Sequence, residues 1–328
     1  MRPLFLLAVL GLVTATGCDT IVSGDGTSSS QASSTSSTTT SSSPVPAPPP
    51  LWKAGPREVR GELKEIAARF VQEVGTWSAD DDRDAVARIV AAGYPADLLE
   101  TAKPLFGIEA DDVRTTIVYP QYGGLTDTSA SVIVLARQEW RDQGNKRSRE
   151  VEIDVRLRSA ATGWAVTSVV DPARPPGPPQ VPGGPTAQGQ AVLGNPRIAL
   201  PDPVREDIAG RRLGDPIMAV MTALAAEYMI EAQVVITGHP GTVYPTTRLS
   251  NHVVGRAVDV RSINGVRVVD IDRADPVLTA FMAAAGRAGA TEVGGPIRVA
   301  GTGFFTDDVH QDHIHLGITP TKPPAVAA

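Results

Sequence analysis

Two low-complexity segments limit where this chain can form a packed core. Residues 19–50 are almost entirely Ser, Thr, Pro and Gly, and residues 171–190 are rich in Pro and Gly. Such segments bury too little apolar surface to offset the conformational entropy lost on folding. We therefore expect the following organisation: a disordered tether (19–56), a folded accessory domain (57–171), a proline-rich linker (172–192), a second folded domain (193–319) and a disordered tail (320–328).

The first folded segment has the pattern of helices followed by strands. Apolar residues from Val59 to Val74 recur at helical spacing, and a second short helix is expected from Asp84 to Ala92. Strand-like runs begin at Val113, Ser129, Val151 and Gly163. This order predicts an α+β domain in which a curved antiparallel sheet wraps a helix, and it resembles cystatin-like and nuclear-transport-factor-like accessory domains. The segment contains no histidine and no cluster with the pattern of a catalytic site, so we expect a spacer or binding module.

The second folded segment is also expected to be α+β. Asp215-Pro216 and Asp275-Pro276 each have the pattern of an N-cap followed by proline at the first helical position. The run at 232–237 and the run "HIHLGI" near the end are typical of buried strands. We therefore predict a fold of two small α+β domains.

The N-terminus has the pattern of a secretory signal. A basic residue precedes an apolar run from Leu4 to Val13, which at about ten residues is too short to span a bilayer as a mature helix. The stretch "ATGC" ending at Cys18 resembles a bacterial lipobox, which implies a signal peptide over 1–18 and lipidation of Cys18. We therefore expect a lipid-anchored protein on the extracytoplasmic face of the cell membrane; ordinary signal cleavage with an incidental cysteine is the alternative.

Charge and cysteine content exclude several classes of function. The formal net charge of −6 offers no basic excess to neutralise phosphates, so no nucleic-acid partner is expected. Cys18 is the single cysteine, which excludes an intramolecular disulfide framework and a thiolate metal cage.

All five histidines lie between His239 and His315. In a strand, residues two apart face the same way, so His313 and His315 should project together. Asp259 lies in the apolar run "AVDV", where a carboxylate needs a partner to offset its desolvation. Imidazole and carboxylate groups suit Zn²⁺, whose catalytic sites keep three protein ligands and a water. The sequence therefore predicts a zinc site built from His252, Asp259 and His315.

Two motifs in this region resemble a known metallopeptidase clan. Ser250, His252, Gly255, Ala257 and Asp259 match the SxHxxGxAxD signature of the D-alanyl-D-alanine metallopeptidases, a clan that includes murein endopeptidases and the Hedgehog signalling domain. The stretch "HQDHIHLGI" at 310–318 is similar to the murein endopeptidase version of the second motif. The resemblance implies a Hedgehog/D-Ala-D-Ala-peptidase-like fold with zinc ligands His252, Asp259 and His315. It also implies that His313 hydrogen-bonds substrate or bound water, and that His310 or Asp312 is the general base.

The chain departs from the carboxypeptidase branch of this clan at two places. Asp312 occupies the position of a glutamate and Ile314 that of a tryptophan. The upstream arginine that helps to bind substrate in that branch is replaced by "TGHP", with His239, and Arg248 is the nearest arginine before the first motif. Substrate-binding candidates are therefore Arg248, His239 and Ser250, the last of which is also a candidate to orient a ligand.

The resemblance implies a membrane-tethered zinc hydrolase of the cell envelope. The expected activity is a metallopeptidase that hydrolyses peptide bonds in cell-wall peptidoglycan, of the D-alanyl-D-alanine carboxypeptidase or murein endopeptidase type. The zinc ion would activate a water and polarise the scissile carbonyl. The alternative is a non-catalytic, zinc-containing envelope module that binds peptidoglycan or an envelope partner.

Overall fold

The computed structural model describes residues 49–81, 83–170 and 183–319. The predicted signal peptide with Cys18, most of the tether, linker residues 172–182 and the tail at 320–328 lie outside these residues. Among the described residues, no helix combines the length and apolar character needed to cross a membrane.

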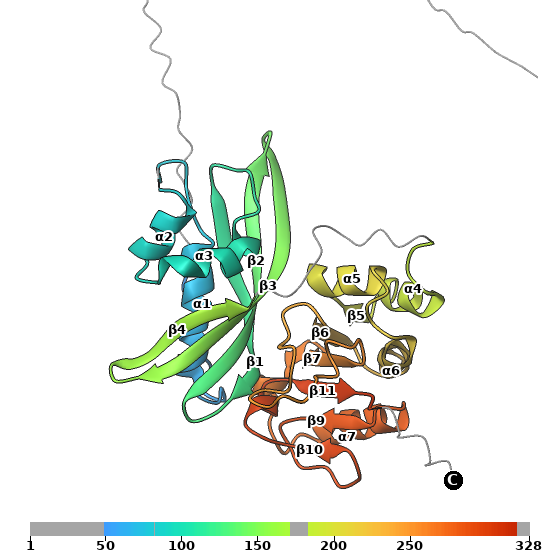
Figure 1. The fold of residues 1–328 in the computed structure, drawn as a ribbon. Coiled ribbons are helices and arrows are strands. Elements are labelled where there is room, and N and C mark those ends of the chain that lie inside the picture. The colour runs from blue at the N-terminus through green and yellow to red at the C-terminus, as the bar shows by residue number, and fades with distance from the viewer. Residues whose placement is uncertain (1–48, 82, 171–182, 320–328) are drawn as a thin grey trace, which may run out of the picture. The chain divides into compact units, whose positions relative to one another are not determined.

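The N-terminal elements form a four-stranded antiparallel sheet in the order β1-β2-β3-β4. The turn from β2 to β3 is tight because Gln143 and Gly144 both have positive φ, as a two-residue hairpin turn requires. Helix α1 packs against all four strands, and its buried apolar face joins theirs in one core (Figure 1). The elements are α1 (Gly61–Val74), α2 (Ala85–Ala91), η1 (Ala96–Leu98), α3 (Leu99–Ala102), η2 (Lys103–Leu105), β1 (Val113–Leu125), β2 (Ser129–Asp142), β3 (Asn145–Ala160) and β4 (Gly163–Val170).

The C-terminal elements form a second, mixed sheet in the order β10-β9-β11-β7-β6-β5, with β8 paired to β7. The successive pairs β6–β7, β7–β11 and β11–β9 are antiparallel, whereas the short edge strands β5 and β10 pair in parallel with β6 and β9. The elements are α4 (Ala187–Leu193), β5 (Ile198–Ala199), α5 (Asp202–Ala209), α6 (Asp215–Ala225), β6 (Ile230–Val234), β7 (Ala257–Ile263), β8 (Val266–Arg267), η3 (Val268–Asp270), α7 (Pro276–Arg287), β9 (Glu292–Gly294), β10 (Phe304–Phe305), η4 (Val309–Gln311) and β11 (Ile314–Gly317).

The prediction of a mixed α+β protein is confirmed, and both sheets are open. Each sheet has its own apolar core, yet the described residues all fall in one compact unit, so the division into two domains stays a prediction. Helix α4 begins at Ala187, inside the segment expected to be a linker. Its start is capped by the Thr186 side chain, which accepts a hydrogen bond from the backbone N–H of Gly189.

The strand expected at 232–237 instead spans Ile230–Val234. The carbonyl oxygen of Val235 lies 2.7 Å from Nδ1 of His252. It therefore accepts a hydrogen bond from that imidazole instead of from the backbone of a neighbouring strand. The chain then leaves the sheet through Gly238, whose φ of 83° is in the left-handed region. This early end of β6 starts the long loop that carries His239 and His252 back to β7.

Candidate metal centre

His252 is held at the end of the loop between β6 and β7 by a tight turn. The backbone N–H of Gly255 donates to the carbonyl of His252 at 2.8 Å, and Gly255 has a φ of 70°. A Cβ at this position would lie 2.1 Å from the carbonyl oxygen of Arg212. Only glycine fits here, which explains the glycine three residues after the histidine. Ser250 Oγ accepts the backbone N–H of His252 at 3.2 Å and so supports the same turn.

The hydrogen bonds of His252 fix which ring nitrogen can bind a cation. Nδ1 lies 2.7 Å from the Val235 carbonyl oxygen, which only accepts, so Nδ1 carries the proton. Nε2 is therefore left with its lone pair. It points to Oδ1 of Asp259 at 3.2 Å and to Nδ1 of His315 at 3.1 Å.

Asp259 and His315 are direct partners on neighbouring antiparallel strands. Asp259 of β7 pairs with His315 of β11, so both side chains leave the same face of the sheet. Oδ1 of Asp259 lies 3.0 Å from Nδ1 of His315, and both residues are buried. Burial opposes ionisation of Asp259, but the neighbouring imidazoles of His252 and His313 outweigh it and hold its pKa well below the usual value.

The outer side of His315 faces a second carboxylate. Nε2 of His315 lies 3.8 Å from Oε2 of Glu292, whose oxygens accept hydrogen bonds from Asn251 Nδ2 and Thr319 Oγ1. Burial disfavours the charged imidazole, but Asp259 and Glu292 outweigh it and raise the pKa of His315 to about 9. A carboxylate on the far side of a histidine is the usual device that orients a metal-binding ring. The sequence motifs contain no signal for Glu292, which the fold brings in from β9.

The donor atoms at this point fit a divalent cation. Nε2 of His252, Oδ1 of Asp259 and Nδ1 of His315 lie 3.0–3.2 Å from one another. Ligands about 2.1 Å from one tetrahedral ion lie roughly 3.4 Å apart, slightly more than the observed spacing. Two imidazoles and one carboxylate also suit Zn²⁺ in ligand type.

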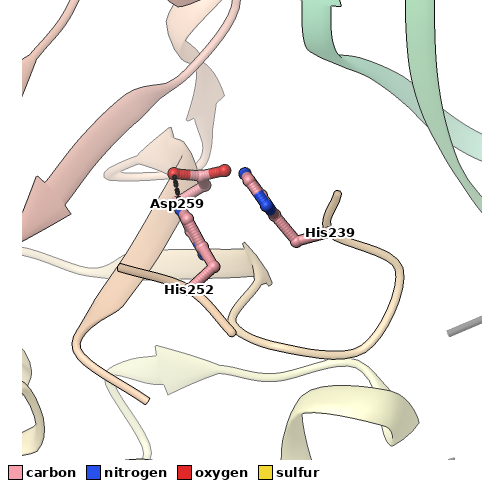
Figure 2. A group of neighbouring side chains, drawn as sticks. All are labelled: His239, His252 and Asp259. Atoms are coloured by element: carbon pink, nitrogen blue, oxygen red, sulfur yellow. Dashed lines mark ion pairs between the residues drawn. The ribbon is translucent and has the colours of Figure 1, made fainter. Parts of the chain in front are cut away.

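His239 adds a third imidazole to the cluster. His239, His252 and Asp259 offer ligand atoms within 4.8 Å of one another, so this group can hold a metal ion. Figure 2 shows the two Asp259 oxygens directed one toward each of these imidazoles. The His239 and His252 rings are stacked, with centroids 3.9 Å apart and planes inclined by 9°. Nδ1 of His239 lies 2.8 Å from the Pro240 carbonyl oxygen, so its Nε2 also keeps its lone pair.

The cluster opens into a cavity of about 470 Å³. His313 lines it, and so do His310, Ser250 and the exposed Arg248. The structure thus brings every predicted catalytic, metal-binding and substrate-binding residue except Asp312 to this cavity. The opposite wall includes the Tyr122–Gly124 stretch of β1, which belongs to the other sheet.

His310 lines the cavity, and one of its two ring nitrogens has a carboxylate partner. Its Nδ1 lies 2.7 Å from Oδ1 of Asp307, two residues before η4, so Nδ1 donates and Nε2 keeps its lone pair. Burial lowers the pKa of His310, and Asp307 opposes this only in part. A neutral imidazole beside the cluster has the properties of a general base.

Asp312 is directed away from the cavity. Its Oδ1 lies 2.5 Å from Nδ1 of His313, and its Oδ2 accepts hydrogen bonds from Lys64 Nζ at 2.5 Å and Tyr122 N at 3.1 Å. Burial opposes ionisation, but Lys64 and His313 outweigh it and hold the pKa of Asp312 at about 2. The carboxylate is therefore an ionised acceptor that orients His313.

Sequence reasoning missed the residues that α1 and β1 contribute. Lys64 and Gln121 are fully buried, and both donate hydrogen bonds to carboxylates of the C-terminal elements. A signal existed for Lys64, because it lies at helical spacing from Ala67 and Val71 and so falls on the apolar face of α1. Gln121 gives no comparable signal.

No family model, curated protein or solved structure matches this chain.

Proposed function

We propose that this chain is a zinc-dependent peptidase whose metal ligands are His252, Asp259 and His315. The observation that carries this proposal is the meeting of three possible ligand atoms, two ring nitrogens and one carboxylate oxygen, within 3.0–3.2 Å beside a cavity. Such a group is stable only around a proton or a cation. The Val235 carbonyl supports the outer nitrogen of His252 and the Glu292 carboxylate that of His315, an arrangement typical of metal-binding imidazoles.

Ring geometry favours His315 over His239 as the second imidazole ligand. An imidazole binds a metal through a lone pair that lies in the plane of the ring. The stacked rings of His239 and His252 are almost parallel, so one ion cannot lie in both planes at bonding distance. The rings of His252 and His315 are inclined by 53°, so their planes intersect. His239 is then a neighbour of the site that flanks His252.

The remaining side chains fit the hydrolysis of an amide bond. When bound, zinc supplies Lewis acidity and lowers the pKa of a water molecule. His310 can accept a proton from the attacking water through Nε2 and return it to the leaving amine, while Asp307 holds its ring. His313, whose pKa is raised because Asp259 and Asp312 outweigh its burial, can donate a hydrogen bond to the substrate's carbonyl oxygen.

The proposed substrate is a peptide of the cell-wall peptidoglycan. The two histidine motifs support this choice through their similarity to D-alanyl-D-alanine metallopeptidases and murein endopeptidases. The exposed guanidinium of Arg248 at the cavity supports a substrate that carries a carboxylate. A lipid anchor at Cys18 would place the enzyme next to this substrate on the extracytoplasmic face of the membrane.

The test is hydrolysis of defined muropeptides by the purified chain, followed by mass spectrometry. We expect cleavage of a peptide bond by the zinc-loaded protein and none after removal of the metal with a chelator. Zinc binding without cleavage of any muropeptide would instead support a non-catalytic zinc module of the envelope. A wild-type protein that binds no zinc would contradict the proposal.

A further inference from the structure

A side chain of the first sheet reaches the carboxylate that we assign as a metal ligand. Nε2 of Gln121, in the middle of β1, donates to Oδ2 of Asp259 at 2.6 Å. Both side chains are buried, with exposed fractions of 0% and 2%. A hydrogen bond to an ionised acceptor away from water is stronger than a neutral one, so this contact constrains the carboxylate.

The hydrogen bond from Gln121 gives the two oxygens of Asp259 different partners. Oδ1 faces Nε2 of His252 and Nδ1 of His315. Oδ2 accepts the hydrogen bond of the Gln121 amide at 2.6 Å, and Nε2 of His313 lies farther from it, at 3.7 Å. A carboxylate without a donor on Oδ2 can rotate and present either oxygen to the imidazoles. The Gln121 amide removes that freedom and leaves Oδ1 as the oxygen directed to the ion.

The orientation of the Gln121 amide is fixed by charge. Placing its oxygen toward Asp259 would set two acceptors 2.6 Å apart, so the nitrogen must face the carboxylate. Oε1 is buried and has no hydrogen-bond partner among the described residues. Leaving a buried polar atom unpaired is costly, so packing alone does not favour a glutamine at this position. The hydrogen bond that its amide donates to Asp259 is what favours it.

The residue after Gln121 fixes the strand at a second point. The backbone N–H of Tyr122 donates to Oδ2 of Asp312 at 3.1 Å, and Asp312 orients His313. The carbonyl oxygen of Tyr119, two residues before Gln121, accepts from Gln233 Nε2 at 3.3 Å. Residues 119–122 of β1 are thus tied to the C-terminal elements on both sides of Gln121, which holds the amide in place.

We propose that Gln121 is a positioning residue for the metal ligand Asp259, so that β1 is part of the metal centre. This inference rests on the proposed function, because it requires Asp259 to bind the ion. It assigns segment 57–171 a role in the site itself, beyond that of a spacer. Outer-shell partners of metal ligands typically change metal affinity by about 10–100-fold when they are replaced.

The test compares two glutamines of the same sheet. Gln121→Met keeps the length of the side chain and removes the donor. Gln138→Met makes the same change on β2, where the buried amide donates to the carbonyls of Gly75 and Leu105 away from the site. Zinc affinity of the full chain is measured by competition with a chromogenic chelator, and unfolding in urea is measured in parallel.

We expect Gln121→Met to weaken zinc binding about 10–100-fold. Gln138→Met should keep the affinity within about threefold even though it lowers stability, since it lies outside any contact with a ligand. Equal zinc affinity of Gln121→Met and wild type would overturn the inference. An equal loss in both variants would also overturn it, because the effect would then come from general destabilisation.

A second variant keeps the test decisive if Gln121→Met does not fold. Gln121→Asn retains an amide but shortens the side chain by one methylene, about 1.5 Å, which takes the donor out of hydrogen-bond reach. It should weaken zinc binding by at least tenfold, and unchanged affinity counts against the inference. If wild type binds zinc and cleaves muropeptides, and both variants have the zinc affinity of wild type, only the proposed role of Gln121 is contradicted. Wild type without zinc affinity would remove the proposed function as well.

Discussion

Nζ of Lys64 lies 2.5 Å from Oδ2 of Asp312, although the two residues are 248 positions apart in the chain. Lys64 also pairs with Glu58, and its side chain is fully buried. One ammonium thus faces two carboxylates away from water. Removing one member of a buried ion pair leaves an uncompensated charge, whereas the intact pair contributes little net stability.

Lys64→Met should therefore destabilise the protein by about 3–5 kcal/mol, because it leaves Asp312 and Glu58 buried without their cation. Lys53→Met is the matched control, since Lys53 pairs with Glu65 at the surface and its side chain is 66% exposed. That variant should change the free energy of unfolding by less than about 1 kcal/mol. Urea unfolding curves measure both, and similar values for the two variants would show that the buried cluster is not a charged pair.

His315→Ala should abolish stoichiometric zinc binding, whereas His239→Ala should retain it. The physical reason is the ring geometry: the His315 plane intersects that of His252, and the His239 plane is nearly parallel to it. Zinc content after gel filtration, measured by atomic absorption, distinguishes the two variants. Loss of zinc in His239→Ala with retention in His315→Ala would assign the third ligand to His239 instead.

His310→Gln should lower the rate of muropeptide cleavage by about 10²–10⁴-fold while zinc remains bound. The glutamine cannot accept and return a proton, but it fills similar space beside Asp307. Asp312→Asn serves as the comparison, because the structure makes Asp312 an acceptor for Lys64 and His313 outside the cavity. Full activity of His310→Gln with loss of activity in Asp312→Asn would move the role of base to Asp312.

Glu152 makes stability depend on pH. It is buried on β3, and neither of its carboxylate oxygens has a hydrogen-bond partner among the described residues. Burial, with the Asp207 and Asp259 charges, raises its pKa well above the usual value of 4.5. As pH rises above 4.5, the unfolded chain releases this proton while the folded protein keeps it. Stability therefore falls by about 1.4 kcal/mol per pH unit until the folded pKa is passed.

Glu152→Gln should remove this dependence. The variant's free energy of unfolding, relative to wild type, should increase by about 2 kcal/mol between pH 5 and pH 7. Urea titrations at the two pH values provide the measurement, and Glu139→Gln, which changes an exposed carboxyl on β2, is the control. A constant difference between Glu152→Gln and wild type across this range would show that Glu152 is ionised in the folded state.

The sequence by itself determined the local features of this protein. Strand alternation predicted that His313 and His315 project together, because strand geometry depends only on neighbouring residues, and both side chains line the cavity. The Asp275-Pro276 start of α7, with Asp275 as N-cap, and the helical stripe of α1 were predictable for the same reason. The matching prediction for α6 was wrong in detail: its N-cap is Gly214, and Asp215 is the first helical residue and makes no capping hydrogen bond. His252, Asp259 and His315 were therefore identified before their distances were known.

Only the tertiary structure decided what each functional group contacts. Asp312 had the sequence position of a base, but Lys64 of α1 and Tyr122 of β1 donate hydrogen bonds to its Oδ2, and Asp312 does not line the cavity. Gln121 reaches Asp259 across 138 positions of the chain. The sequence pattern contains no information on such contacts, because they arise from the packing of one sheet's side chains against another's and not from any local periodicity.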